Sequence, residues 1–169
     1  MSKEKIASGH FSADVAEFIF LLNKYEVKYL LVGGEAVIFY GHARLTGDVD
    51  FFYENTASNA EALYNALMEF WNSNIPEIQN ATELQEPGLI LQFGLPPNRI
   101  DLLNSISGVQ FDRAWTNRVN VGTVWQDNQI NINFIGKADL IANKRSANRS
   151  KDQDDIKYLT VDETDRSAN

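Results

Sequence analysis

Residues 28–54, KYLLVGGEAVIFYGHARLTGDVDFFYE, decide the fold of this chain. Residues 29–32 (YLLV) form an apolar run with the length and β-branching of a buried strand. Gly33 and Gly34 end that strand, and residues 35–40 predict a short helix. A strand that leads through a glycine pair into a helix is therefore expected at the centre of the fold.

A second strand is predicted at residues 48–52 (DVDFF), after a loop. Side chains alternate along a strand, so Asp48 and Asp50 point to the same side. Two adjacent carboxylates repel unless a cation lies between them, and Mg²⁺ prefers such hard oxygen ligands. Gly33 and Gly34 lack a Cβ, so a phosphate can approach the main chain at the start of the helix. The pattern predicts a site for divalent metal and phosphate. The alternative is that Asp48 caps a turn and Asp50 faces solvent.

Length and composition are those of one soluble domain. The chain has 169 residues, 44% of them apolar and 22% charged, so we expect a single domain over residues 1–169, with flexible tails at 1–9 and 160–169. The absence of cysteine excludes disulfides and cysteine-ligated zinc. No signal segment or bilayer-spanning apolar run is present, which predicts a cytoplasmic protein without a membrane partner.

The net charge of −8 argues against a general nucleic-acid binder. A nucleic-acid substrate would have to be held by a local basic patch.

The rest of the chain alternates between helical and strand patterns. Helices are predicted at 12–25, with Ser12 as N-cap, and at 59–71, 109–117, 136–147 and 151–159. Strands are predicted at 88–94, 99–103, 118–124 and 129–134. The strand at 99–103 is expected to run antiparallel to the one at 88–94, across a turn. Helices flanking a mixed sheet place the chain in the α/β (α+β) class.

Asp101 is a third carboxylate of interest, because it sits inside an apolar strand. A lone carboxylate is costly to bury unless it is paired or bound to metal. If its strand lies beside residues 48–52, Asp101 completes a triad. The alternative is a surface pair between Arg99 and Asp101.

Residues 137–157 are rich in charge, and most of them are interpreted as a solvated helical face. Lys144 and Arg149 follow the apolar part of the helix and could reach a triphosphate. Five residues correspond to about 140° around a regular helix, so Arg149 joins Lys144 at one phosphate only if the helix breaks. Arg44 and Thr46, just upstream of the carboxylate pair, are also predicted to lie near bound phosphate.

Together these motifs resemble the DNA polymerase beta-type nucleotidyltransferase superfamily. The similarity rests on Gly33-Gly34, on Arg44-x-Thr46-x-Asp48-x-Asp50 and on Arg99-Ile-Asp101. The closest similarity is to small stand-alone bacterial and archaeal members, the minimal nucleotidyltransferases and the abortive-infection type toxins. The segment from Lys144 to Asp155 resembles the end of those proteins, and the resemblance covers roughly residues 27–159.

The resemblance implies a mixed sheet flanked by helices and transfer of a nucleoside monophosphate from an NTP to an acceptor hydroxyl, with Mg²⁺ or Mn²⁺ as cofactor. Asp48 and Asp50 would hold the metals, and Asp101 would share one metal and help to deprotonate the acceptor. Gly33, Gly34, Arg44, Thr46, Lys144 and Arg149 would bind the nucleotide. The chain has Gly34 where many members have serine, so backbone N–H groups would replace that hydroxyl.

The acceptors of this superfamily include small-molecule antibiotics, proteins and tRNA ends. A second hypothesis is a toxin that modifies tRNA or protein by the same chemistry and is paired with an antitoxin protein. A third is a non-catalytic nucleotide-binding module, against which the intact triad argues. The chain has no G-x-x-x-x-G-K-[ST] loop and no G-x-G-x-x-G motif.

Overall fold

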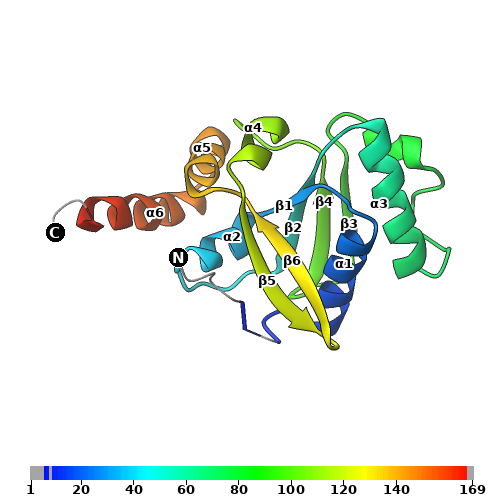
Figure 1. The fold of residues 1–169 in the computed structure, drawn as a ribbon. Coiled ribbons are helices and arrows are strands. Elements are labelled where there is room, and N and C mark those ends of the chain that lie inside the picture. Colours follow the sequence, from blue (N-terminus) through cyan, green and yellow to red (C-terminus); the bar gives the residue numbers. More distant parts are fainter. Residues whose placement is uncertain (1–5, 8, 167–169) are drawn as a thin grey trace.

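A mixed β-sheet forms the centre of the molecule (Figure 1). The computed structural model describes residues 6, 7 and 9–166, and within them six strands are arranged in the order β3-β4-β2-β1-β6-β5. The strands are β1 (Tyr29–Val32), β2 (Asp48–Tyr53), β3 (Ile90–Phe93), β4 (Arg99–Leu103), β5 (Val119–Trp125) and β6 (Asn128–Phe134). The predicted α+β class and the mixed sheet are confirmed.

The register of the central strands brings the predicted carboxylates together. Strand β2 pairs antiparallel with β1 and parallel with β4, and in the latter pair Asp50 lies opposite Asp101. Strand β3 is antiparallel to β4, as expected, and places Gln92 on the other side of Asp101. Side chains at paired positions lie on the same face of a sheet. The sheet therefore carries Asp50, Asp101 and Gln92 in one row.

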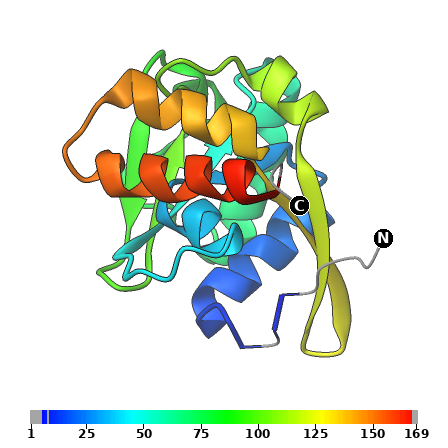
Figure 2. The same ribbon diagram turned by 90° about the vertical axis from the view of Figure 1, so that its left-hand side faces the viewer.

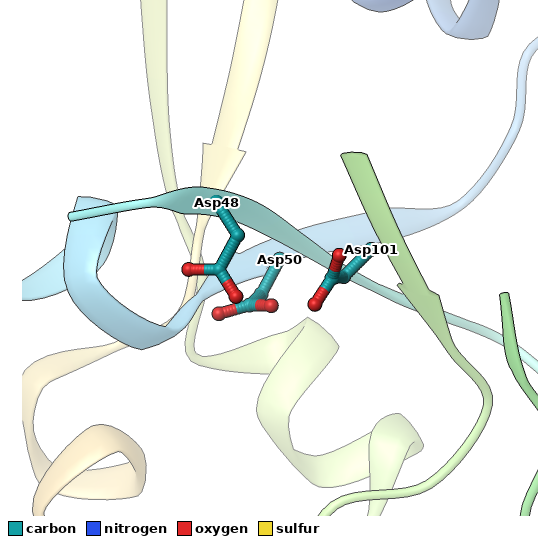
Figure 3. A group of neighbouring side chains, drawn as sticks. All are labelled: Asp48, Asp50 and Asp101. Carbon is teal, nitrogen blue, oxygen red and sulfur yellow. The ribbon is translucent and has the colours of Figure 1, made fainter. Parts of the chain in front are cut away.

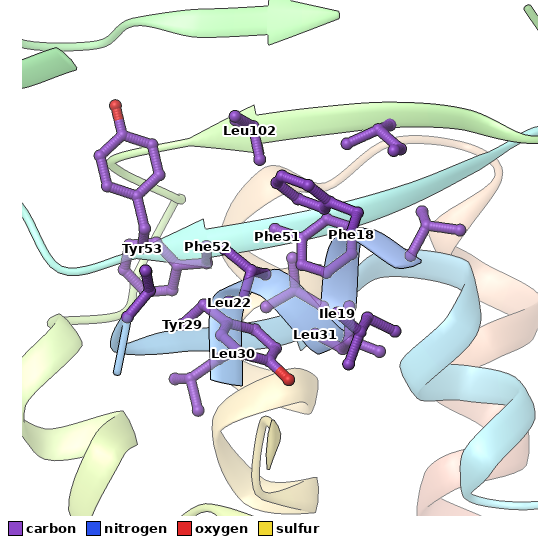
Figure 4. Packing of buried hydrophobic residues seen from close by; sticks show 14 of the residues in the cluster. Phe18, Ile19, Leu22, Tyr29, Leu30, Leu31, Phe51, Phe52, Tyr53 and Leu102 are labelled. Atoms are coloured by element: carbon purple, nitrogen blue, oxygen red, sulfur yellow. The ribbon is translucent and has the colours of Figure 1, made fainter. Parts of the chain in front are cut away.

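The two faces of the sheet have different roles. Phe51 points to the face covered by α1 (Ala13–Lys24) and α3 (Ala57–Phe70), where its ring lies 5.2 Å from that of Phe18. Figure 4 shows the packing of α1 and the central strands in this core. Phe52 points to the opposite face and packs on Phe111 at the start of α4 (Phe111–Thr116). By alternation, Asp48 and Asp50 share the face of Phe52, away from the main core.

The remaining helices are α2 (Gly33–Phe39), the 3₁₀ helix η1 (Ala81–Gln85), α5 (Lys137–Ala147) and α6 (Asp152–Arg166). Among them, η1 packs against α3, and its Leu84 carbonyl accepts a hydrogen bond from Tyr53. Figure 2 shows α5 and α6 side by side across the sheet, joined by a short connection. The sequence predicted that the last helix would end at Leu159, but α6 extends to Arg166. No glycine or proline stands between residues 160 and 166 to end it.

The predicted tails fall in part outside the described residues, which exclude 1–5, 8 and 167–169. Ser12 caps α1 as expected, since its hydroxyl accepts a hydrogen bond from the backbone N–H of Val15. None of the helices in the described part of the chain has the length and apolar character needed to cross a bilayer.

Two leucines of matched chemistry test where the core lies. Leu31 is fully buried in β1, whereas Leu95 in the β3–β4 turn is 81% exposed. Leu31→Ala should lower the free energy of unfolding by about 2–5 kcal/mol because it leaves a cavity. Leu95→Ala should change it by less than about 0.5 kcal/mol. Urea unfolding of both variants measures the difference, and equal losses would contradict this assignment of the core.

Candidate functional site

The carboxylates of three aspartates lie close together beside the glycine turn. Asp48 and Asp50 come from β2 and Asp101 from β4, and each offers an oxygen within 4.8 Å of the others (Figure 3). Asp101 is only 5% exposed, and both aspartates of β2 are half-buried. The structure thus brings the predicted triad together, in an arrangement suited to divalent metal ions.

Arg99 binds two of these three carboxylates. Its Nε donates to Asp101 Oδ1 at 2.8 Å, and one terminal nitrogen donates to Asp101 Oδ2 and to Asp48 Oδ2, both at 3.0 Å. The predicted alternatives of a triad and an Arg99–Asp101 pair are therefore both present. Gln92 also donates to Asp101 Oδ2, at 3.2 Å.

Asp50 has the most perturbed ionisation of the site. Burial, together with the neighbouring charges of Asp48 and Asp101, raises the pKa of Asp50 to about 7. The positive charges of Lys151 and Arg99 oppose this rise without cancelling it. A cation bound among the three carboxylates would remove the electrostatic cause of the raised pKa.

The glycine pair is required by close packing as well as by the turn. Gly33 has a φ of +64°, and a Cβ at this position would collide with the Asp50 carboxylate. A Cβ on Gly34 would lie 2.7 Å from Thr46 Oγ1 and 2.9 Å from a terminal nitrogen of Arg44. Gly33 is thus the residue that lets the turn pass over Asp50. At Gly34, the space that a side chain would take is occupied by Arg44 and Thr46.

A cavity of about 750 Å³ opens over the carboxylates. The cavity contains all three carboxylates, both turn glycines and a set of cationic side chains. The cations that line it are Arg44, Arg99, Lys144, Arg149 and Lys151. Thr46 does not line the cavity. Its hydroxyl donates to the backbone carbonyl of Asp48 at 3.0 Å and so steadies the start of β2.

The helix breaks between Lys144 and Arg149, which is the condition set above for Arg149 to reach a ligand. Helix α5 ends at Ala147, and Asn148 adopts a left-handed conformation with a φ of +47°. Arg149 is thereby redirected, and its Nε donates to Asp152 Oδ2 at 2.8 Å. Its side chain is still 53% exposed at the cavity wall, so it can contact a ligand there.

Lys144 has a different environment from the one predicted. It is 2% exposed, and its ammonium lies 3.1 Å from Asp152 Oδ1 and 3.0 Å from Asp155 Oδ2. Asp155 also lies 3.1 Å from a terminal nitrogen of Arg44, which ties the loop before β2 to α6. Lys144 is thus the buried centre of an ion-pair cluster, with its charge already shared by two carboxylates.

Sequence reasoning assigned no role to Lys151 or Gln92, and it used Arg99 only as a possible partner of Asp101 and as part of the Arg99-Ile-Asp101 motif. Lys151 immediately precedes α6, within the segment from Lys144 to Asp155 on which the resemblance partly rests, but charge alone did not distinguish it from the other lysines of residues 137–157. Gln92 and Arg99 are placed at the triad by strand pairing, because they lie opposite Asp101 and Asp48 respectively. The predicted antiparallel pairing of the strands at 88–94 and 99–103 was the available signal.

Comparison with known families identifies the fold. The family model described as a nucleotidyltransferase of unknown function, DUF6036, matches residues 13–165. The chain belongs to this family. The match spans the central strands, the triad and both C-terminal helices, so the site described above lies wholly inside the nucleotidyltransferase domain. A search of curated proteins found no match.

The raised pKa of Asp50 predicts a pH-dependent stability for this nucleotidyltransferase. Between about pH 4 and pH 7 the folded protein keeps a proton that the unfolded chain, with a carboxyl pKa near 3.8, has lost. The contribution of Asp50 to stability therefore falls as pH rises through this window and is constant above it. Asp50→Asn removes the effect. In EDTA, the free energy of unfolding of wild type relative to Asp50→Asn should fall by roughly 2–4 kcal/mol from pH 4 to pH 8. A difference that does not vary with pH would contradict the assignment.

Proposed function

We propose that this nucleotidyltransferase moves a nucleoside monophosphate from an NTP to an acceptor hydroxyl with the help of divalent metal ions. The convergence of Asp48, Asp50 and Asp101 at the floor of a cation-lined cavity carries the proposal. A triphosphate needs positive charge along its length, and the reaction needs oxygen ligands for metal at its reacting end. The cavity provides both.

The three carboxylates fit a divalent metal. Their oxygens lie within 4.8 Å of one another, and the pKa of Asp50 is raised by burial and by the neighbouring charges of Asp48 and Asp101, which Lys151 and Arg99 only partly offset. Asp48, Asp50 and Asp101 would therefore hold Mg²⁺ or Mn²⁺. When bound, such ions neutralise the phosphate charge and increase the acidity of the acceptor hydroxyl.

The order of the strands supports a proposal for which end of the cavity takes the triphosphate and which takes the acceptor. The glycine turn after β1 lies on one side of the carboxylates, and Gln92 of β3 lies on the other. Gly33 and Gly34 leave the main chain accessible, while Arg149 and Lys151 supply charge from the α5–α6 connection. The triphosphate would lie along this side. The acceptor would then approach from the side of β3 and β4, next to Asp101.

In this proposal, Asp101 acts on the acceptor. In the proposed step the acceptor oxygen attacks the α-phosphorus and forms the new P–O bond, while the bond from the α-phosphorus to the bridging oxygen breaks. Pyrophosphate leaves with that electron pair, and the acceptor proton passes to Asp101. A hydrogen bond from Gln92 orients the Asp101 carboxylate for this role.

Asp50→Asn should abolish nucleotidyl transfer, because it removes a metal ligand from the centre of the triad. The measurement is transfer of label from each α-labelled NTP, with Mg²⁺ or Mn²⁺, to tRNA, cell protein, aminoglycosides or lincosamides. Asp154→Asn is the matched control, since this carboxylate is exposed on α6 and lies outside the cavity. Transfer by Asp50→Asn at the wild-type rate would reject the proposal.

Two lysines test whether the cationic side chains that line the cavity, here called the cationic wall, bind phosphate. Lys151 lines the cavity close enough to Asp50 to affect its pKa, whereas Lys157 is exposed and lies outside the cavity. Lys151→Ala should raise the Kd for NTP by about tenfold, because one charged contact to phosphate is lost. Lys157→Ala should leave the Kd unchanged. Fluorescence titration with a labelled NTP measures both, and equal effects would show that the wall does not bind phosphate.

The effect of these substitutions on nucleotide binding is easier to interpret than that of Lys144→Ala, which would leave Asp152 and Asp155 without their shared cation. Breaking a buried ion pair of this kind costs about 3–5 kcal/mol of stability. A loss of activity in Lys144→Ala would then report on folding as well as on nucleotide binding.

A further inference from the structure

Arg99 is the one guanidinium within the described residues that bonds directly to the proposed metal ligands. It belongs to β4, two residues before Asp101, and its position in the sheet pairs with Asp48 on β2. The guanidinium therefore spans the two strands that carry the triad. Its side chain is 29% exposed, so it lies at the cavity surface and has room to move.

We propose that Arg99 is an internal counter-ion of the triad that competes with divalent metal for Asp48 and Asp101, and so sets the metal affinity of the site. The inference rests on the proposed function, because it takes the triad as the metal site. It assigns Arg99 a positioning role toward the carboxylates.

The competition follows from which oxygens are used. Both oxygens of Asp101 and one oxygen of Asp48 accept hydrogen bonds from Arg99, at 2.8–3.0 Å. Asp101 is bonded in a bidentate way, so Arg99 already balances its negative charge. A divalent ion entering the triad also meets the repulsion of a fixed positive charge. Arg99 must then give up part of its contact before the carboxylates can ligate the metal fully.

Gln92 can keep the Asp101 carboxylate in place when Arg99 moves away from it. Its amide donates to Asp101 Oδ2 at 3.2 Å and carries no charge. Asp101 therefore keeps one orienting hydrogen bond when Arg99 moves. The Thr46 hydroxyl lies 3.0 Å from the backbone carbonyl of Asp48 and 3.3 Å from Asp48 Oδ1, and its one hydrogen is shared between these two acceptors.

The test is the affinity for Mn²⁺ alone, measured by calorimetry or by electron paramagnetic resonance, without nucleotide or acceptor. Arg99→Gln should bind Mn²⁺ about tenfold more tightly than wild type, because the competing charge is gone. Arg145→Gln is the control. It removes the same charge from an exposed position of α5 outside the cavity and should leave the Mn²⁺ affinity unchanged.

Arg99→Lys gives a second variant should Arg99→Gln not fold. It keeps the charge but loses the two-pronged contact, so its Mn²⁺ affinity should lie between those of wild type and Arg99→Gln. Thermal unfolding adds an independent measure, since Mn²⁺ should raise the Tm of either variant by more than that of wild type.

Unchanged or weaker Mn²⁺ binding by the Arg99 variants would overturn the inference and would leave the proposed function standing. Absence of Mn²⁺ binding by both wild type and Arg99→Gln would overturn the metal role of the triad itself, and this inference with it.

Discussion

Repulsion among three carboxylates is the constraint on which the rest of the site depends. One carboxylate oxygen from each of Asp48, Asp50 and Asp101 lies within 4.8 Å of the others, on the sheet face opposite the main core. The fold tolerates this charge in two ways. Asp50 keeps its proton up to about pH 7, and Arg99 forms ion pairs with the other two carboxylates. Metal binding would replace both compensations, which explains how a cluster that opposes stability can be retained as a binding site.

A second charge cluster joins the C-terminal helices to this site. Lys144 is buried between Asp152 and Asp155, and Asp155 also pairs with Arg44 from the loop before β2. The cations and anions of this cluster nearly balance, so it serves to hold the α5–α6 pair against the cavity, in the arrangement of Figure 2. Arg149 and Lys151 are presented to the cavity by the connection that this cluster fixes. The C-terminal helices are thus part of the site.

Much of the fold could be predicted from sequence, because the signals were local. Strands β1 and β2, the glycine turn and the capped helix α1 each follow from periodicity and turn chemistry, and the family match agrees with the resemblance carried by the carboxylates. The burial of Lys144 could not be predicted, since its two partners lie eight and eleven residues away on another helix. The contacts of Arg99 with Asp48 depend on the parallel pairing of β2 and β4, which no short-range pattern specifies. The sequence-based prediction ended the last helix at Leu159 because the residues after it are polar, whereas α6 continues to Arg166.

Crystals grown with Mn²⁺ and a non-hydrolysable NTP would test the central claim most directly, through the anomalous scattering of the metal. The account predicts a manganese peak between Asp48, Asp50 and Asp101, with the triphosphate extending toward the glycine turn and the α5–α6 connection. Manganese bound elsewhere, or a nucleotide bound with no metal at the three carboxylates, would contradict it.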